Sequence, residues 1–337
     1  MNSMPLVIVY CLAFNHEKYI SKTIEGFISQ KTTFNFLCII HDDASTDNTA
    51  KIIKEYEERY PYIIHGIYQK ENQYSKGVPI IKDYILPLVN SKYVAICEGD
   101  DFWEDESKLQ KQYDILENNK NCFMCVHRTK ELYENGTFNN NFYPNYDLPE
   151  GIIDKKKTIL DGYLFHTSSY FFEACKWKSY IMNLPDFAKN CGVGDIPYIL
   201  YFINVGEIYY LPIVMSCYRR GVPGSWSVKM NNTNLELLCE NVMQHSKRLY
   251  KMFKLFDIYS GFKYNDVCLK KQSVFYLQQC TLSCHMSNFF TKQNFKLFMA
   301  LDIKKKIFCV LALSFPNYMR TWYLKRIFRL NKERMGI

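Results

Sequence analysis

Short apolar runs alternate with segments of helical periodicity early in the chain, and this alternation restricts the fold more than any other feature. The runs at 6–12, 36–40 and 93–97 are rich in apolar and β-branched residues, as buried strands are. Segments 17–30 and 48–60 carry apolar residues at helical spacing. Further strands are expected at 62–68, 168–173 and 208–212, and further helices at 79–89, 104–118, 154–164 and 195–205. Strands that alternate with helices predict an α/β fold with a Rossmann-like, mostly parallel sheet flanked by helices.

Two acidic clusters follow predicted strands. Asp42 and Asp43 come after one strand, and Glu98-Gly99-Asp100-Asp101 comes after another. In open sheets of this kind, ligands lie beyond the carboxyl ends of the strands. Grouped carboxylates repel each other unless a cation neutralises them, and Mg²⁺ and Mn²⁺ prefer carboxylate and phosphate oxygens. The second cluster therefore suits a cation with a sugar diphosphate. The carboxylates of the first cluster can accept hydrogen bonds from a nucleobase imide or a ribose hydroxyl. Alternatively, each cluster caps the helix that follows it.

Other candidate site residues lie in the second half of the chain. Asp195 precedes a predicted helix, where an Asp is also a common N-cap. Arg219 and Arg220, with Trp226 nearby, could bind a leaving diphosphate and stack on a sugar, or could belong to a solvated basic loop. His166 is flanked by small polar residues, as many structural histidines are, although it could also contact an acceptor.

Positive charge is concentrated at the C-terminal end of the chain. The sequence has 42 Lys and Arg against 34 Asp and Glu, and eleven of these cations but only two acids follow Met286. The rest of the chain is therefore nearly neutral. A domain that binds nucleic acid is expected to carry positive charge, so nucleic acid is not an expected partner. Residues 231–337 are predicted to form a helical, basic region. It either lies on an anionic membrane or packs on the rest of the chain.

Cysteine usage and hydropathy bear on the compartment. The thirteen cysteines have no paired zinc-finger spacing, so reduced core thiols are expected. The amino-terminal segment lacks the basic start of a signal peptide, and the longest apolar stretch, 307–315, is shorter than the ~20 residues of a membrane span. We therefore expect a cytoplasmic protein, either free or peripheral at the inner face of the membrane.

The order and spacing of these motifs resemble glycosyltransferase family 2. Residues 7–20 are similar to the opening strand and helix of that family, and residues 42–49 are close to its Asp-Asp-Gly-Ser-x-Asp-x-Thr. Residues 98–101 stand at its Asp-x-Asp-Asp, and Gly194-Asp195-Ile196-Pro197 stands at the place of its catalytic Asp. Residues 212–219 resemble the strand and Tyr-Arg that close its domain. The resemblance covers about residues 5–227.

This resemblance implies an inverting, metal-assisted enzyme of the GT-A fold over residues 1–230, with a donor-binding half at 1–103 and an acceptor half at 104–230. It assigns the donor nucleotide, expected to carry uracil, to Asp43, Asp42, Leu12, Glu98 and Gly99. It assigns Mn²⁺ or Mg²⁺ to Asp100, with Glu98 and Asp101 as alternative ligands, and the catalytic base to Asp195. His166, Arg219, Arg220 and Trp226 are assigned to the acceptor or the diphosphate. The implied acceptor is a glycan or a lipid-linked molecule of bacterial surface polysaccharide or lipopolysaccharide synthesis.

The sequence departs from the family pattern at three places. Glu98 replaces the first Asp of the metal motif, and Ala44 replaces a Gly. For the Arg that the family commonly carries between the two acidic clusters, Lys76 or Lys82 is the nearest substitute. Two alternatives stay open: a sugar nucleotidyltransferase and a non-catalytic protein that binds a glycan or a partner. Residues 13–17 lack the glycine- and arginine-rich loop of the former, and the retained acids argue against the latter.

Overall fold

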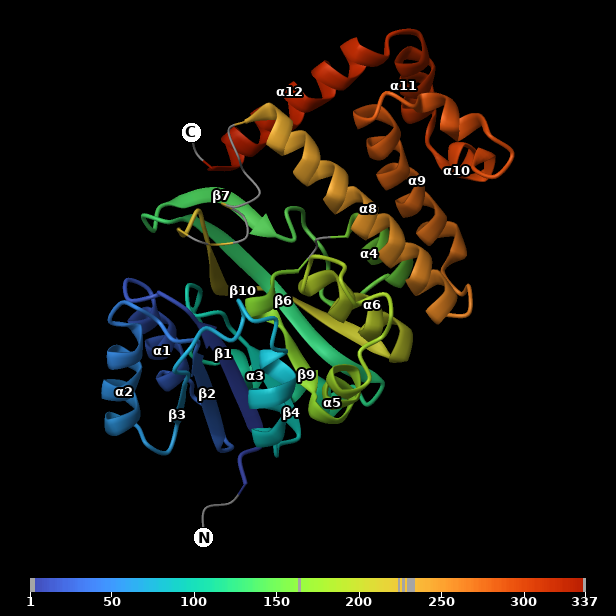
Figure 1. Ribbon diagram of the computed structural model, residues 1–337. Helices are drawn as coiled ribbons and strands as arrows, with labels where there is room; N and C mark the ends of the chain where they lie inside the picture. Colours follow the sequence, from blue (N-terminus) through green and yellow to red (C-terminus); the bar gives the residue numbers. More distant parts are fainter. Residues whose placement is uncertain (1–3, 163–164, 224, 226–227, 229–233, 336–337) are drawn as a thin grey trace. The chain divides into compact units, whose positions relative to one another are not determined.

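The computed structural model describes residues 4–162, 165–223, 225, 228 and 234–335 (Figure 1). The chain divides into two compact units. The first comprises Met1–Ile153, Tyr163–Leu184 and Tyr201–Arg219, and the second comprises Asp154–Gly162, Pro185–Leu200 and Arg220–Ile337. The predicted boundary near residue 230 falls among residues outside the described part, and it stays a prediction.

The first unit is built on a sheet of ten strands in the order β3-β2-β1-β4-β9-β6-β10-β5, with β7 paired to β6 and β8 paired to β10. The strands are β1 (Val7–Ala13), β2 (Phe36–Asp42), β3 (Ile64–Tyr68), β4 (Tyr93–Ile96), β5 (Phe102–Trp103), β6 (Cys122–Tyr133), β7 (Phe138–Tyr143), β8 (Gly151–Ile152), β9 (Phe171–Glu173) and β10 (Glu207–Arg220). The α/β class predicted from the sequence is confirmed.

The two halves of this sheet are paired differently. Strands β3, β2, β1 and β4 run parallel, as predicted. Strand β9 is antiparallel to β4 and β6, and β10 is antiparallel to β5 and β8, so the expectation of a mostly parallel sheet is corrected for this half. Strands β6 and β7 are joined by only a few residues, and such a short connection permits antiparallel pairing alone.

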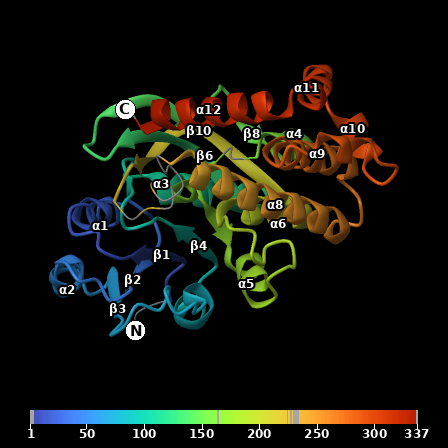
Figure 2. The same cartoon turned by 45° about the horizontal axis from the view of Figure 1, so that its top comes forward.

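Helices cover both faces of the parallel half, because its strands are apolar on both sides. On one face, Val7, Val9 and Cys11 join a core with α1 (Ile20–Ile28), α2 (Thr49–Arg59) and α3 (Lys108–Asn118). On the other face, Tyr10 packs on Trp177 of α5 (Ala174–Met182), with ring centres 5.7 Å apart. Figures 1 and 2 both show α1 and α2 side by side next to the parallel strands.

The helix expected at 79–89 is irregular. It consists of a π-helical turn, η1 (Ile81–Ile85), followed by a 3₁₀ turn, η2 (Leu86–Leu88). Pro87 has no backbone N–H to donate and crowds the preceding turn, which accounts for the break at this point.

The second unit contains α4 (Lys155–Asp161), the first residues of α6 (Asp195–Val205), and the C-terminal helices. These are α8 (Leu235–Tyr259), α9 (Asn265–Leu282), α10 (Phe295–Ala300), α11 (Ile303–Ser314) and α12 (Pro316–Met335). Asn234 caps α8 by accepting from the amides of Glu236 and Leu237. A core that includes Phe289 and Cys309 holds α9, α10, α11 and α12 together. In the described part of the chain, no helix is long and apolar enough to span a membrane.

The first unit contains a fully buried lysine. Lys108, in the first turn of α3, donates to Gln112 Oε1 at 2.7 Å, and its Nζ lies 4.0 Å from the centre of the Trp103 ring. Burial lowers the pKa of Lys108 to about 7. Because the native state then binds fewer protons than the unfolded state above that pH, this group makes the protein more stable as pH rises from 7 toward the ordinary lysine range.

Replacing Lys108 by Met is expected to remove that pH dependence. The contribution of Lys108 to the free energy of unfolding should rise by about 1.4 kcal/mol per pH unit above pH 7, and Lys108→Met should lack this rise. Denaturant unfolding of both proteins at pH 7 and pH 9 measures it. Lys120→Met, at an exposed position, is the matched control and should leave the difference between the two pH values unchanged. Equal pH dependence in the Lys108→Met and wild-type proteins would show that the pKa of Lys108 is not lowered in the folded protein.

Candidate active site

The carboxyl ends of β1, β2 and β4 bring the two acidic clusters together. Ala13 at the end of β1 is paired with Asp42 at the end of β2. The amide of Asp43 donates to the carbonyl of Ala13 at 3.0 Å, and the amide of Gly99 donates to the carbonyl of Leu12 at 3.0 Å. The parallel register therefore places one cluster on each side of the end of β1, as the sequence predicts for a ligand site of an open sheet.

The loops after β1 and β2 are tied to each other by their own side chains. Asn15 Oδ1 accepts from the amide of Thr46 at 2.8 Å, and the amide of Asn15 donates to Ser45 Oγ at 2.9 Å. The amide of Glu17 donates to Asp47 Oδ2 at 3.1 Å. These reciprocal bonds fix the backbone next to the clusters without a ligand, which lowers the ordering cost of binding.

The two carboxylates of the first cluster have different partners. Asp43 is buried, and its oxygens accept from the amides of Gln73 at 2.7 Å and Tyr74 at 3.0 Å. Asp42 Oδ2 accepts from the amide of Ser45 at 3.2 Å, whereas its buried Oδ1 has no hydrogen-bond partner in the part of the chain that the structure describes. Asp43 thus holds the 72–74 turn in place, and Asp42 keeps an open acceptor.

The residue between this cluster and α2 has a left-handed backbone. Ala44 has a φ of 59°, a conformation that costs an L-residue with a Cβ about 1–2 kcal/mol. This explains why the family pattern has Gly at this position.

Substituting Ala44 by Gly is expected to stabilise the protein by about 1 kcal/mol, because the strain disappears while some unfolded-state entropy is lost. Denaturant unfolding should show a higher midpoint at an unchanged slope. Ala50→Gly is the matched control: Ala50 lies inside α2, so the same change there should cost about 1 kcal/mol. A lower midpoint for Ala44→Gly would show that the left-handed backbone is not strained.

The second cluster contains one carboxylate that is held firmly by the protein. Asp101 is buried, and its Oδ1 accepts from the amide of Arg219 at 2.9 Å. Burial, and then the charge of Asp100, raise the pKa of Asp101. Burial and the same charge raise the pKa of the half-buried Glu98 to about 7. A compact group of acids at this position therefore favours a positive partner.

Arg219 connects the cluster to the antiparallel half of the sheet. Its guanidinium donates to the carbonyl of Asp100 at 2.6 Å, and it lies 4.6 Å from the ring centre of Phe102 and 5.2 Å from that of Tyr19. Arg219 thus fixes the backbone of the acidic turn. Arg220, the next residue of β10, belongs to the second unit, and Trp226 lies outside the described residues.

His166 belongs to a chain of polar side chains that the sequence did not reveal. Its ring stacks on Tyr218 with centres 4.3 Å apart, and its Nε2 lies 3.7 Å from Asp101 Oδ2. His166 Nδ1 is 2.9 Å from Ser168 Oγ, which lies 2.8 Å from Ser216 Oγ. Ser216 in turn lies 2.9 Å from Thr129 Oγ1 of β6. Hydroxyl residues inside β6 and β10 were the available signal, but β6 was not predicted as a strand.

Asp195 begins α6 in the second unit. Its Oδ1 accepts from the amide of Ile196 at 2.8 Å, so it has an N-terminal helix position as the sequence suggests. Lys76 forms an exposed ion pair with Glu71, and Lys82 lies in η1. The first unit therefore brings together Leu12, Asp42, Asp43, Glu98, Gly99, Asp100, Asp101, His166 and Arg219, while Asp195 and Arg220 belong to the second.

The acids at 98–101 fit a divalent cation that takes some of its ligands from the protein and the others from a substrate. Among the described residues, no group of three or more His, Cys, Asp or Glu side chains is arranged to hold a metal alone. Mg²⁺ is usually bound by one or two carboxylates together with substrate phosphates and water. No hydrogen bond from any described residue reaches the carboxylate of Asp100, so this side chain suits that role.

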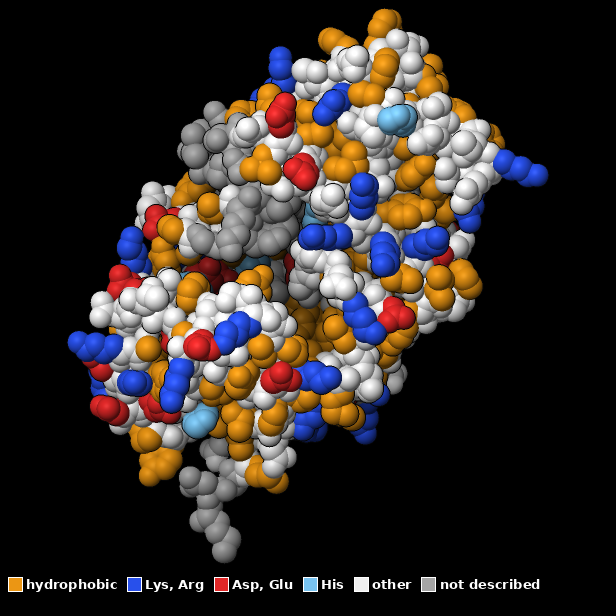
Figure 3. All heavy atoms as spheres, in the orientation of Figure 1, with side chains coloured by type: hydrophobic (Ala, Val, Ile, Leu, Met, Phe, Trp, Pro, Cys, Tyr) orange, Lys and Arg blue, Asp and Glu red, His pale blue; other side chains and the backbone are white. Residues whose placement is uncertain are grey.

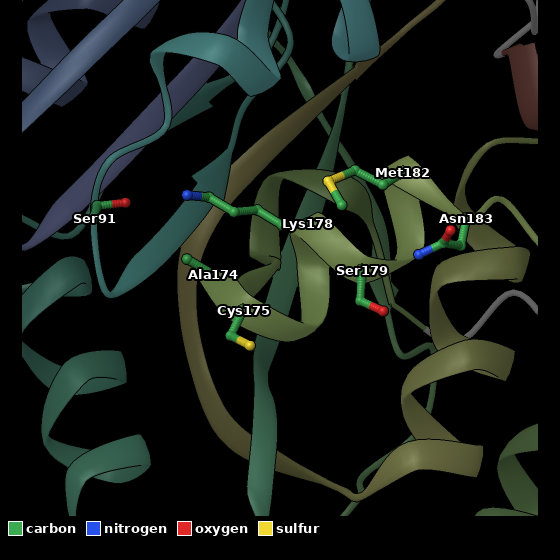
Figure 4. Close-up of a pocket in the computed structure, with 7 residues that line it drawn as sticks. All are labelled: Ser91, Ala174, Cys175, Lys178, Ser179, Met182 and Asn183. Carbon is green, nitrogen blue, oxygen red and sulfur yellow. The ribbon is translucent and has the colours of Figure 1, made fainter.

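A separate surface hollow of the first unit lies at the other end of β4. Its lining comes from α5, the residue after it, and the loop before β4: Ser91, Ala174, Cys175, Lys178, Ser179, Met182 and Asn183 (Figure 4). The lining has one cation and no carboxylate, so it does not share the chemistry of the acidic clusters.

The chain is similar to a known protein family and to several known proteins. Residues 8–176 match the model of the family "Glycosyl transferase family 2". An uncharacterized protein of Mycobacterium tuberculosis is 33% identical over 220 residues, which cover 65% of this chain and 60% of that protein. The chain therefore spans less than two thirds of the length of this relative. The Escherichia coli protein WfaP, named a UDP-Glc:alpha-D-GlcNAc-diphosphoundecaprenol beta-1,3-glucosyltransferase, is 32% identical over 36% of this chain and 45% of its own length.

A solved structure shares the fold. The Staphylococcus aureus protein TarS, residues 1–349 in complex with UDP-GlcNAc, aligns with a TM-score of 0.57 at 12% identity. The alignment covers 98% of this chain and 92% of that one. At this identity the likeness concerns the fold alone, and it confirms the GT-A architecture expected from the sequence.

Proposed function

Because the chain belongs to glycosyltransferase family 2, we propose that it transfers a sugar, with inversion, from a nucleotide diphosphate donor to an acceptor hydroxyl. The observation that carries the proposal is the pair of acidic clusters on the two sides of the end of β1. One cluster offers acceptors to a nucleoside, and the other suits a cation with a diphosphate. A sugar nucleotide contains these parts side by side.

The first cluster and β1 would bind the nucleoside. Asp42 Oδ1 is the buried acceptor that still lacks a partner within the described part, so it suits an imide N–H of uracil or a ribose hydroxyl. Asp43 positions the 72–74 turn and keeps lone pairs for the base. At Gly99, an added Cβ would lie 2.7 Å from His16 Nδ1 and 3.2 Å from the carbonyl of Leu12. Gly99 therefore lets the acidic turn approach β1 closely.

The second cluster would hold the diphosphate through Mn²⁺ or Mg²⁺. Asp100 is the proposed ligand, and Glu98, one methylene longer than the family's Asp, would reach the ribose or a metal-bound water. When bound, such a cation neutralises the charge on the leaving diphosphate. Asp101 accepts a hydrogen bond from the amide of Arg219, and this bond holds the acidic turn in place. His166 and Arg220 stay candidates for the acceptor and the diphosphate, and so does Trp226.

Asp195 is the proposed catalytic base. It would take the proton of the acceptor hydroxyl while that oxygen forms its bond to the anomeric carbon. The bond from this carbon to the diphosphate oxygen breaks, and its electron pair stays on the nucleoside diphosphate. A single displacement of this kind turns an α-linked donor into a β-linked product.

We further propose a UDP-sugar as donor and a glycan or lipid-linked acceptor in bacterial surface polysaccharide synthesis, at the inner face of a membrane. The similarity to WfaP supports this, because the name of that protein specifies a UDP-sugar donor, a diphosphate-linked lipid acceptor and a β-linked product. The motifs of the donor half lie inside the region that matches the family.

A ligand screen tests the proposed donor site. Thermal stability and nucleotide release are measured with UDP-, GDP-, CMP- and dTDP-sugars, with and without Mn²⁺. We expect stabilisation by UDP-sugars that requires the cation, together with slow release of UDP. No response to any sugar nucleotide would favour a non-catalytic protein that binds a glycan or a partner. Formation of a sugar nucleotide from a nucleoside triphosphate and a sugar phosphate would show a nucleotidyltransferase instead.

A further inference from the structure

Helix α11 of the second unit has apolar side chains on two opposite faces. Cys309 and Ala312 are buried in the core of the unit. On the outer face, Ile303 is 76% exposed, and Ile307 and Val310 are each 55% exposed. Positions four and seven residues apart lie on one side of a helix. This outer face is therefore a continuous aliphatic strip in contact with solvent.

Large apolar side chains are also exposed directly after α11 and at the start of α12. Phe315 is 60% exposed, Tyr318 is 69% exposed and Trp322 is 41% exposed. Tyr318 and Trp322 are four residues apart and so share one side of α12. Figure 3 shows hydrophobic side chains at the surface of the C-terminal region, at the top of the view. Isolated exposed apolar residues are common in proteins, but a strip of large ones marks an interaction site.

Cations adjoin this strip. Trp322, Lys325, Arg326 and Arg329 line a surface hollow on α12, and the Arg326 guanidinium lies 5.5 Å from the Trp322 ring centre. Lys304, Lys305 and Lys306 occupy the first turn of α11. From Met286 to Leu330 the sequence has nine Lys and Arg, and Asp302 is the single acid. The region thus carries a strong positive charge beside exposed aliphatic and aromatic groups.

We propose that this surface, called the α11–α12 face, binds an anionic lipid bilayer. The face consists of Ile303, Ile307, Val310, Phe315, Tyr318 and Trp322 with the cations Lys325, Arg326 and Arg329. Its aliphatic side chains enter the boundary between headgroups and acyl chains, Trp322 lies at headgroup level, and the cations bind lipid phosphates. No helix among the described residues is long and apolar enough to span the bilayer, so α11 and α12 lie on its surface.

Charge argues for a bilayer over other occupants of this face. A second copy would bring an equally positive surface against it, and like charges oppose such a contact. Nucleic acid would satisfy the cations but not the aliphatic strip of Ile303, Ile307 and Val310. An anionic bilayer matches both properties. This inference rests on the proposed function, which places the chain at a membrane. Vesicle binding is nevertheless measurable without any sugar transfer.

Vesicle sedimentation of the full chain tests the α11–α12 face. The protein is mixed with vesicles of phosphatidylcholine alone or with phosphatidylglycerol added, at low and high salt. We expect binding to the anionic vesicles that weakens with salt. Lys325→Gln with Arg326→Gln should lower the partition coefficient about fivefold for each charge removed. Ile307→Asp with Val310→Asp should lower it at least about tenfold, because the variant places two carboxylates at the strip.

Ile258→Asp is the matched control, because Ile258 is 54% exposed on α8 and lies outside the face. It should bind vesicles like the wild type, and unchanged melting of all variants shows that they are folded. Equal binding of wild type and both double variants would overturn the proposal. So would self-association that Ile307→Asp with Val310→Asp abolishes, or binding of free phosphate without binding of vesicles. Cation-dependent UDP-sugar binding, measured on the same proteins, should be unchanged and reports separately on the proposed function.

Discussion

Replacing Asp195 by Asn is expected to remove nearly all sugar transfer while leaving donor binding intact. General-base catalysis contributes about 10²–10⁴-fold to rate, so kcat should fall within that range. Asn keeps a side-chain oxygen that can accept from the amide of Ile196, as Asp195 does at 2.8 Å, so the start of α6 should fold normally. Transfer to an acceptor and the stabilisation by donor nucleotide are measured on the same preparation.

Asp186→Asn is the control for this substitution. Asp186 is an exposed Asp of the same unit, paired with Lys189 at 2.7 Å, and its change should leave transfer unaffected. An Asp195→Asn protein that transfers sugar at the wild-type rate would remove Asp195 from the role of base. Loss of donor stabilisation in Asp195→Asn would instead indicate a structural role.

The parallel half of the sheet could be predicted because its determinants are local. The runs that become β1, β2 and β4 are apolar on both faces, and each connecting helix carries its own periodicity. Helix α6 begins and ends at the predicted residues, 195 and 205. The acidic clusters could be located for the same reason, since each directly follows a readable strand.

The antiparallel half could not be predicted in the same way. The segment of β6 contains Lys130 and Glu131 among its apolar residues, so its periodicity is weak. Its place in the sheet depends on pairing with β9 and β7, which no local pattern encodes. The series of polar contacts from His166 through Ser168 and Ser216 to Thr129 joins segments that are distant in sequence. No local pattern could predict these contacts either.

The structure also distinguishes Asp100 from the neighbouring Asp101, which the resemblance leaves as an alternative ligand. Asp101 is buried and bonded to the amide of Arg219, whose guanidinium bonds to the carbonyl of Asp100. These two bonds fix the turn from both sides. The carboxylate of Asp100 takes no part in them, which supports the proposal that it binds the cation.

Replacing Asp100 by Asn is therefore expected to remove the cation dependence of donor binding. The variant should fold, lose the extra stabilisation that Mn²⁺ gives with a sugar nucleotide, and lose at least about 100-fold in kcat, because the cation supplies several kcal/mol to the departing diphosphate. A titration of Mn²⁺ in the presence of the nucleotide, followed by thermal stability, measures the first effect, and a transfer assay measures the second.

Asp101→Asn is the matched control at the next residue. Its amide oxygen can still accept from the amide of Arg219, so the turn and the response to Mn²⁺ should survive within a few-fold. Asp101→Ala removes that acceptor and should cost about 1–3 kcal/mol of stability, because the partly buried amide of Arg219 loses its partner. If Asp100→Asn kept the Mn²⁺ response and Asp101→Asn lost it, the ligand would be Asp101. The acidic turn would then have to open away from Arg219 when the donor binds.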